Sequence, residues 1–310
     1  MVRPRSGVEV SAFDKVIAAT LPLAPKPLVR VFARPYVAGE TLEDQIRVIE
    51  DLNSKGFMVA SGILGEFVTR REESEAAVRD YQKCLDEFAA RKLDSNVHVK
   101  PTHLGLKLDK DFCYQNVRRI LEHARGYGNF VRMDMEDSPC IDDTLDLYFR
   151  LREDFENVGC VIQARMRRSL ADVRRLAAAK ANVRLCKGVY IEPREVAFTD
   201  ARIIQENYAL LLDELLSAGC YVGIATHDEV LIWDANRIID RLGLKQNQYE
   251  FQMLHGVEPM LRRIVRGQGH RLRVAVPFGP NWYPYSIRRL RKNPAIAGYV
   301  LKAVLKNGKA

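Results

Sequence analysis

Strand-like segments recur along the chain with a helical segment between each pair, and this repetition restricts the fold more than any single motif. Eight short stretches rich in β-branched and aromatic residues begin about 31 residues apart on average, the length of one strand–helix–strand unit. These stretches are Phe57–Gly62, Val97–Lys100, Phe130–Asp134, Val158–Ala164, Asn182–Lys187, Cys220–Thr226, Tyr249–Met253 and Leu272–Val276. The intervening segments have helical periodicity, as in Asp200–Ala218, where isoleucines and leucines roughly follow a helical period among polar residues.

Eight units of this kind predict an α/β fold, a (β/α)8 TIM-like barrel. A doubly wound sheet is the rival, but its phosphate-binding glycine motifs, GxGxxG and GxxxxGK[ST], do not occur in the sequence. Residues 1–40 precede the first unit and hold five of the 13 prolines. We therefore expect an N-terminal helical arm or cap over 1–40 and the barrel over 41–310.

Composition narrows the class of protein further. A hydrophobic fraction of 47% in 310 residues excludes general disorder, and no apolar run approaches the about 20 residues that cross a bilayer. The N-terminus lacks the apolar stretch of a secretory signal. The six cysteines form no CxxC pair, which favours free thiols in a reducing compartment over disulfides or a zinc site. We expect a cytoplasmic protein.

The net charge of +8 permits several partners. A basic surplus is compatible with nucleic acid, an anionic membrane surface or a pocket for acidic ligands. It is equally compatible with basic side chains that are simply spread over solvated helices.

Polar side chains accompany the predicted strands and gather near their carboxyl ends, where a barrel builds its active site. An unpaired charge in such apolar surroundings costs several kcal/mol, so these groups must pair with one another, with solvent or with a ligand. They are Lys100, Asp134, Gln163, Arg165, Arg184, Lys187, Thr226, His227, Glu250 and Gln252. Basic groups outnumber acidic ones, which indicates an anionic ligand such as a phosphate or pyrophosphate. The simpler interpretation is a Lys100–Asp134 salt bridge that only ties neighbouring strands.

A second cluster follows the last strand. If a helix begins at Pro284, then Tyr285, Arg288 and Arg289 share one of its faces. Two adjacent guanidinium groups could hold a small carboxylate in a bidentate manner. The alternative is a solvated basic helix end.

Taken in order, these motifs resemble the flavin-dependent proline dehydrogenases, specifically the short monofunctional bacterial type. The resemblance covers nearly the whole chain, and its strength comes from many weak motifs at fitting spacing. The matching segments are Phe32–Thr41, Leu64–Glu66, Val99–Thr102 with Leu104 and Gly105, Arg132–Glu136, Gln163–Arg165, Arg184–Tyr190, Ala225–Asp228, Phe251–Gly256 and Trp282–Arg289.

The resemblance implies non-covalent FAD and oxidation of L-proline to Δ1-pyrroline-5-carboxylate, by hydride transfer from proline C5 to the flavin N5. Electrons would then pass to a quinone, a separate pyrroline-5-carboxylate dehydrogenase would consume the product, and no metal is needed. By the same resemblance Asp134 and Arg184 are catalytic. The substrate-binding residues would be Lys100, Leu254, Tyr285, Arg288, Arg289 and Glu66, with Glu66 able to pair with Arg288 as a gate. The flavin-binding residues would be Met135, Gln163, Arg165, Lys187, Gly188, Val189, Thr226 and His227.

Two positions depart from the family pattern. Ala275 stands where the family usually has a tyrosine that packs on the proline ring, and Lys292 stands where its helix motif has a glutamate. We expect weaker proline binding than in a member that has both residues.

Two other functions compete with this interpretation. A barrel enzyme could form a Schiff base on Lys100 or Lys187, as aldolases do. A non-enzymatic binder of nucleic acid or anionic membrane could use the basic stretch Arg288–Lys292. Neither explains the polar residues on so many strands, so we expect no nucleic-acid partner. Peripheral contact with the inner membrane would suffice for electron delivery to a quinone.

Overall fold

The computed structural model of the chain describes residues 29–30 and 35–291, without the side chains of Pro284 and residues 288–291. Eight parallel strands close into a barrel in chain order, and the last strand pairs with the first. The strands are β1 (Met58–Ile63), β2 (Ser95–Val99), β3 (Val131–Met133), β4 (Val158–Gln163), β5 (Asn182–Cys186), β6 (Tyr221–Ala225), β7 (Tyr249–Leu254) and β8 (Leu272–Phe278). The predicted barrel and all eight predicted strands are confirmed.

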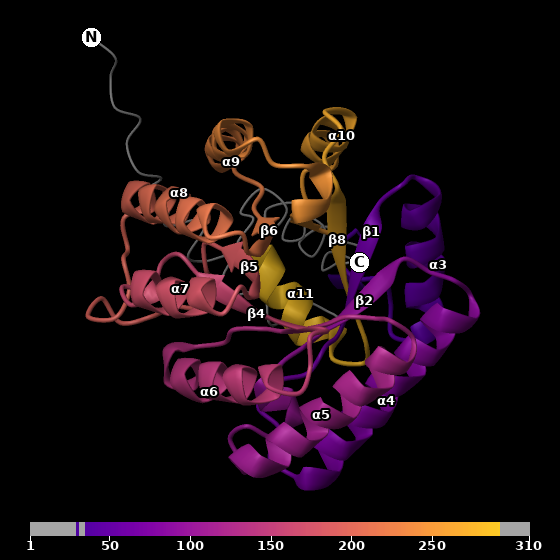
Figure 1. The fold of residues 1–310 in the computed structure, drawn as a ribbon. Coiled ribbons are helices and arrows are strands. Elements are labelled where there is room, and N and C mark those ends of the chain that lie inside the picture. Colours follow the sequence, from indigo (N-terminus) through magenta and orange to yellow (C-terminus); the bar gives the residue numbers. More distant parts are fainter. Residues whose placement is uncertain (1–28, 31–34, 292–310) are drawn as a thin grey trace, which may run out of the picture.

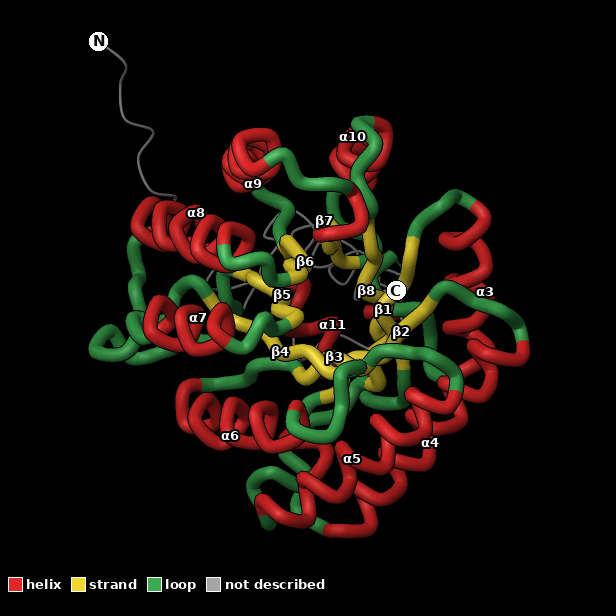
Figure 2. The backbone as a smooth tube through the Cα atoms, in the orientation of Figure 1, coloured by secondary structure: helices red, strands yellow, loops and turns green. Residues whose placement is uncertain are grey.

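Helices surround the barrel as an outer layer (Figures 1 and 2). They are α3 (Leu42–Ser54), α4 (Arg71–Ala90), α5 (Lys110–Gly126), α6 (Ile141–Arg152), α7 (Ser169–Ala178), α8 (Ala201–Ser217), α9 (Glu229–Leu242) and α10 (Pro259–Gly267). Helix α11 (Trp282–Arg291) follows β8 and is seen at the centre of the view, inside the ring of outer helices (Figure 1). It begins at Trp282, whereas the sequence analysis considered a start two residues later, at Pro284.

Capping side chains fix where several helices begin. Thr41 and Asp44 form a reciprocal capping box at α3, and Asp200 accepts backbone N–H groups at the start of α8. Asp228 caps α9 in the same way. The caps of α8 and α9 lie in the loops that follow β5 and β6, whereas α3 precedes β1.

Alternation along each strand separates the core from the barrel lumen. In β5, Val183 and Leu185 are fully buried against the helix layer, where the hydroxyl of Tyr208 on α8 donates to the Leu185 carbonyl at 3.0 Å. Between them, Arg184 faces the lumen and reaches Asp134. The outward residues therefore supply the packing, and the inward residues supply the chemistry.

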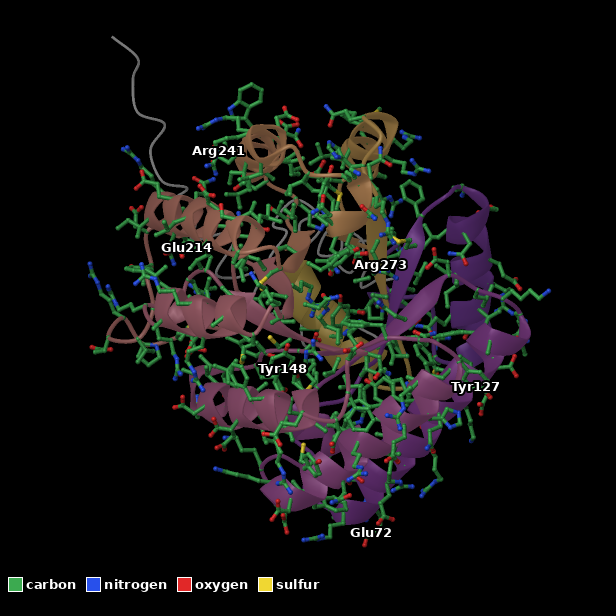
Figure 3. All side chains as sticks on the ribbon, in the orientation of Figure 1. Glu72, Tyr127, Tyr148, Glu214, Arg241 and Arg273 are labelled. Carbon is green, nitrogen blue, oxygen red and sulfur yellow. The ribbon has the colours of Figure 1, made fainter. Side chains whose placement is uncertain are left out.

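The lower part of the lumen is filled by a paired polar floor. Arg273 on β8 donates from Nε to the Glu250 carboxylate at 2.8 Å, and the Tyr221 hydroxyl donates to its other oxygen at 2.9 Å. Figure 3 shows Arg273 in the middle of the barrel. The sequence grouped Glu250 with the residues near the strand ends, and this is wrong because Glu250 lies at the beginning of β7. Its charge belongs to the floor.

Small residues line the lumen above the floor on the β6–β8 side. Gly223 and Ala225 on β6, and Ala275 on β8, alternate with the polar floor residues and so face inward. Gln252 lies against Gly223, whereas Ala225 and Ala275 are only partly buried, although both lie in strands of a closed barrel.

Two further features bear on expectations from the sequence. All six cysteines are free thiols, five of them buried. None of the helices among the described residues is long and apolar enough to cross a membrane. Most of the expected N-terminal arm over 1–40 lies outside the described residues, so the arm stays a prediction.

The polar floor leads to a stability prediction. Replacing Arg273 with Met would leave the buried Glu250 carboxylate without its counter-ion, and we expect the free energy of unfolding to fall by about 3–5 kcal/mol. Adding Glu250→Gln should restore most of this loss. Arg241→Met breaks an exposed pair with Asp213 and should cost under about 1 kcal/mol. Urea denaturation of the unmodified protein and the three variants measures these free energies of unfolding.

The pH dependence gives an independent check. Burial alone would raise the pKa of Glu250, but Arg273 holds it below its usual value. This depressed pKa stabilises the fold above the unfolded value of about 4.3, and the contribution is lost as pH falls. Without Arg273, burial raises the pKa of Glu250, so this carboxyl group takes up a proton in the folded variant as the pH falls. The loss in free energy of unfolding caused by Arg273→Met should therefore be smaller at pH 5 than at pH 7. A deficit that stays constant over that range would contradict the assignment.

Candidate active site

The site is centred on the carboxylate of Asp134, directly after β3. The backbone N–H of Asp134 donates to the Val99 carbonyl at 2.8 Å, which fixes the residue beside the end of β2. Arg184 on β5 pairs with Oδ1, and His98 Nδ1 on β2 lies 3.0 Å from Oδ2. Each carboxylate oxygen thus has its own partner, and residues from three strands converge on one charge.

Electrostatics keep this carboxylate ionised. Burial alone would raise the pKa of Asp134, but the neighbouring Arg184, the hydrogen-bonded His98 and Lys100 outweigh it and hold the pKa well below its ordinary value. Asp134 is therefore a fixed negative charge in the lumen at neutral pH. Such a charge attracts a cationic group of a ligand without titrating in the working range.

Lys100 pairs with Glu66 and not with Asp134. Its Nζ lies 2.6 Å from the Glu66 carboxylate, in the loop after β1. The interpretation of Lys100 and Asp134 as a simple inter-strand salt bridge is therefore wrong. Beside this pair, a Cβ on Gly65 would overlap the ring of His103, whose burial and proximity to Lys100 lower its pKa to about 4. His103 is neutral at pH 7.

A second group of polar side chains follows β4 and β5. Gly188 has a φ of +100°, and a Cβ there would lie 2.6 Å from Cδ of Arg165 and 2.9 Å from Oε1 of Gln163. Arg165 in turn donates to the Tyr190 carbonyl. Gln163 Oε1 and Arg165 Nε are buried without a hydrogen-bond partner among the described residues. Buried polar atoms of this kind are exceptional and mark a place where a ligand can complete the bonding.

Glu136 fixes the orientation of Gln163 in this second group. It is fully buried and accepts the Thr102 backbone N–H at 2.9 Å and its hydroxyl at 2.6 Å. Burial raises the pKa of Glu136, and the bonds from Thr102 offset part of the rise. The Glu136 carbonyl accepts from Gln163 Nε2 at 2.8 Å, which fixes the orientation of the Gln163 amide.

A third group lies at the ends of β5, β6 and β7. Lys187 Nζ is 2.9 Å from Asp228, and Thr226 Oγ1 accepts the Asp228 backbone N–H at 3.1 Å. His227 Nε2 accepts the backbone N–H of Leu254 at 3.0 Å. The predicted flavin residues Lys187, Thr226 and His227 are thus neighbours, and Leu254 adjoins them.

Helix α11 carries the remaining predicted residues. Tyr285 is half-buried, and Trp282 at the helix start donates from Nε1 to Glu40 at 3.0 Å. Arg288 and Arg289 lie in this helix, but their side chains lie outside the described part of the structure, as does the whole of Lys292. Their expected clamp on a carboxylate therefore stays a prediction.

The structure thus brings the predicted residues of β2 to β7 together at one end of the barrel, with Met135 buried beside Asp134 and Val189 exposed in the loop after β5. The sequence missed His98, Thr102 and Glu136. His98 was accessible, because it lies two residues before Lys100 and so on the same face of β2. Thr102 and Glu136 had no comparable signal, since both act through buried bonds between loops.

Comparisons with known proteins agree with this arrangement. A family model described as proline dehydrogenase matches residues 45–302. Proline dehydrogenase 1 of Bacillus subtilis strain 168 is 35% identical over 277 residues, which cover 89% of this chain and 92% of that protein. Proline dehydrogenase of Deinococcus radiodurans is 34% identical over 301 residues, covering 93% and 97% of the two chains.

Solved structures match in fold. Proline utilization A from Bdellovibrio bacteriovorus has a TM-score of 0.79 at 23% identity, over 84% of this chain and 32% of that one. Its counterpart from Corynebacterium freiburgense has a TM-score of 0.73 at 18% identity, over 98% and 36%. The present chain spans about a third of these longer chains.

The close contact at Gly188 leads to a second prediction. Gly188→Ala adds backbone strain and a Cβ that crowds Arg165 and Gln163, so we expect a loss of about 2–4 kcal/mol in the free energy of unfolding. Gly243→Ala is the matched control, because Gly243 has a φ of +60° with nothing within 4 Å of the new Cβ. It should cost only the strain, about 1–2 kcal/mol. Equal losses in the two variants would show that Gly188 is not crowded.

Proposed function

The chain belongs to the proline dehydrogenase family, and we propose that it oxidises L-proline to Δ1-pyrroline-5-carboxylate with non-covalently bound FAD. As a member of this family it is an oxidoreductase of proline catabolism. The observation that carries the finer proposal is the convergence, at one end of the barrel, of side chains that the family resemblance assigns to substrate and flavin.

The residues present suit a flavin nucleotide. Gln163 Oε1 and Arg165 Nε are buried polar atoms without partners among the described residues, and the absence of a side chain at Gly188 lets Arg165 and Gln163 pack against its backbone. Bound FAD would supply the hydride acceptor. The proposed contacts are Met135, Gln163, Arg165, Lys187, Gly188, Val189, Thr226 and His227.

Substrate binding is proposed at Asp134 and helix α11. Arg288 and Arg289 hold the proline carboxylate, and Lys100, Asp134, Leu254 and Tyr285 surround the ring. The negative charge of Asp134 attracts the substrate nitrogen, and Arg184 fixes the direction of that carboxylate. Glu66, which the structure pairs with Lys100, is proposed to exchange this partner for Arg288 when the substrate is enclosed.

Electron transfer to a quinone is supported by the distribution of exposed apolar side chains. Phe67, Ile191, Trp233 and Met260 are 44%, 99%, 65% and 60% exposed, and each follows the carboxyl end of a strand. Exposed apolar side chains around one end of a protein are typical of contact with a membrane or an apolar partner. We therefore place peripheral membrane contact at the active-site end, in a reducing compartment that suits the free thiols, and assign the product to a separate pyrroline-5-carboxylate dehydrogenase.

The Schiff-base alternative loses support from the same contacts. A Schiff-base lysine must be free to attack a carbonyl carbon, whereas the amines of Lys100 and Lys187 each lie against a carboxylate, at 2.6 and 2.9 Å.

The visible absorption spectrum tests the proposal directly. The purified protein, or the protein reconstituted with FAD, should show flavin bands that bleach when L-proline is added without oxygen, and D-proline should leave them unchanged. A protein that FAD cannot reconstitute would contradict the cofactor assignment. Flavin bands that persist with L-proline would keep the cofactor and contradict the substrate.

The departure at Ala275 gives a further prediction. Ala275 faces the lumen beside Leu254 and is only partly buried, so an aromatic ring there would cover the substrate ring. We expect Ala275→Tyr to lower the KM for proline about two- to tenfold, with kcat retained. Ala275→Leu, which adds bulk without a ring, should change KM less. An unchanged KM in the tyrosine variant would rule out this packing role.

A further inference from the structure

His98 is a lumen residue for which the family resemblance provides no role. It lies in β2 between Val97 and Val99, which are both fully buried in the outer core, so its side chain points inward. The Tyr81 hydroxyl on α4 donates to the His98 carbonyl at 3.1 Å and holds the backbone at this point. The imidazole is 16% exposed at the upper lumen.

The ring spans the distance from β3 to β1. On one side Nδ1 lies 3.0 Å from Asp134 Oδ2. On the other side a Cβ built on Gly62 would overlap Cε1 and Nε2 and would lie 3.0 Å from Nδ1. Gly62 does not have a positive φ, so its own backbone conformation does not require glycine. The neighbouring ring is what excludes a side chain at position 62.

The charges around the ring fix its hydrogen-bonding direction. Asp134 is ionised and can only accept, so Nδ1 carries a proton and donates it to Oδ2. Arg184 occupies the other oxygen of Asp134, while the nearby Lys100 is paired with Glu66. Nε2 is buried and has no hydrogen-bond partner among the described residues. Among the described residues, the bond to Asp134 is therefore the one hydrogen bond of this ring.

We propose that His98 is a positioning residue that fixes the catalytic carboxylate of Asp134, and that Gly62 is the position that makes room for it. His98 holds Oδ2 while Arg184 holds Oδ1, so the carboxylate plane cannot rotate. With one of these bonds removed, the carboxylate turns about the remaining one, and its charge moves relative to the substrate nitrogen. The catalytic consequence rests on the proposed oxidation of proline.

A double-mutant cycle tests the proposal. His98→Ala removes the bond, and Gly62→Ala displaces the ring that makes it, so each should lower kcat/KM about ten- to a hundredfold. In the double variant the alanine at position 62 occupies the space left by the imidazole. The double variant should therefore be no slower than His98→Ala alone. Losses that simply multiply would overturn the proposal.

Two further variants separate positioning from packing. In His98→Asn the side-chain amide can take the place of Nδ1, and kcat/KM should recover to within about threefold of the unmodified protein. Gly159→Ala crowds another buried side chain, at the beginning of β4, because its Cβ would lie 2.6 Å from Arg132 Nη1. It should lower the free energy of unfolding with little change in kcat/KM. A His98→Asn variant as slow as His98→Ala, or coupling confined to unfolding, would reduce His98 to a packing residue.

The tautomer of His98 provides a readout without turnover. Nitrogen-15 NMR of histidine-labelled protein should show the proton on Nδ1 in the unmodified chain and loss of that signature in Gly62→Ala. A ring that carries its proton on Nε2 alone would overturn the proposal whatever the activity. If the tautomer and its loss are as expected while L-proline fails to bleach the flavin, the proposed substrate fails and the positioning of Asp134 stands.

Discussion

One buried carboxylate organises the carboxyl end of this barrel. Asp134 is 13% exposed, and an unpaired charge at that depth would cost several kcal/mol. Arg184 and His98 remove this penalty by bonding one oxygen each, and they come from β5 and β2. The interaction therefore joins non-adjacent strands across the lumen. The same bonds that make the charge tolerable also fix where it points, so stability and positioning have a common origin.

The lumen consists of two layers with different electrostatic character. In the lower layer Glu250 has Arg273, Tyr221 and Gln252 as partners, and the group is closed to further ligands. In the upper layer buried polar atoms such as Gln163 Oε1 remain without partners among the described residues. A fully paired layer contributes a rigid base, whereas an incompletely paired layer is stable enough to form but gains from a ligand. The division separates the part of the barrel that supports the fold from the part that binds.

Much of the fold could be predicted from the sequence because it depends on local periodicity. The repeat of strands and helices determined the barrel, and alternation within each strand determined which residues face inward. Pairing across the lumen could not be predicted in the same way. The simpler interpretation paired Lys100 with Asp134, but Lys100 meets Glu66, because the loop after β1 lies beside the segment after β2, where the Phe67 N–H donates to Thr102. Glu250 was assigned to the wrong end although it is the second residue of the predicted strand Tyr249–Met253, because alternation gives the face on which a side chain lies and not its depth in the lumen.

Glycines show the same limit most clearly. Gly188 comes just after a predicted strand, so a turn with a positive φ could have been suspected there. Gly62 lies within a strand and does not have a positive φ, so it gives no local signal. Its role is visible only through the His98 ring that lies against it on the adjacent strand. A side chain at position 62 and an imidazole at position 98 exclude each other in this barrel. The residues at positions 62 and 98 therefore depend on each other. A chain with a side chain at position 62 has no space for the imidazole at position 98, and without the imidazole it loses the second bond to Asp134.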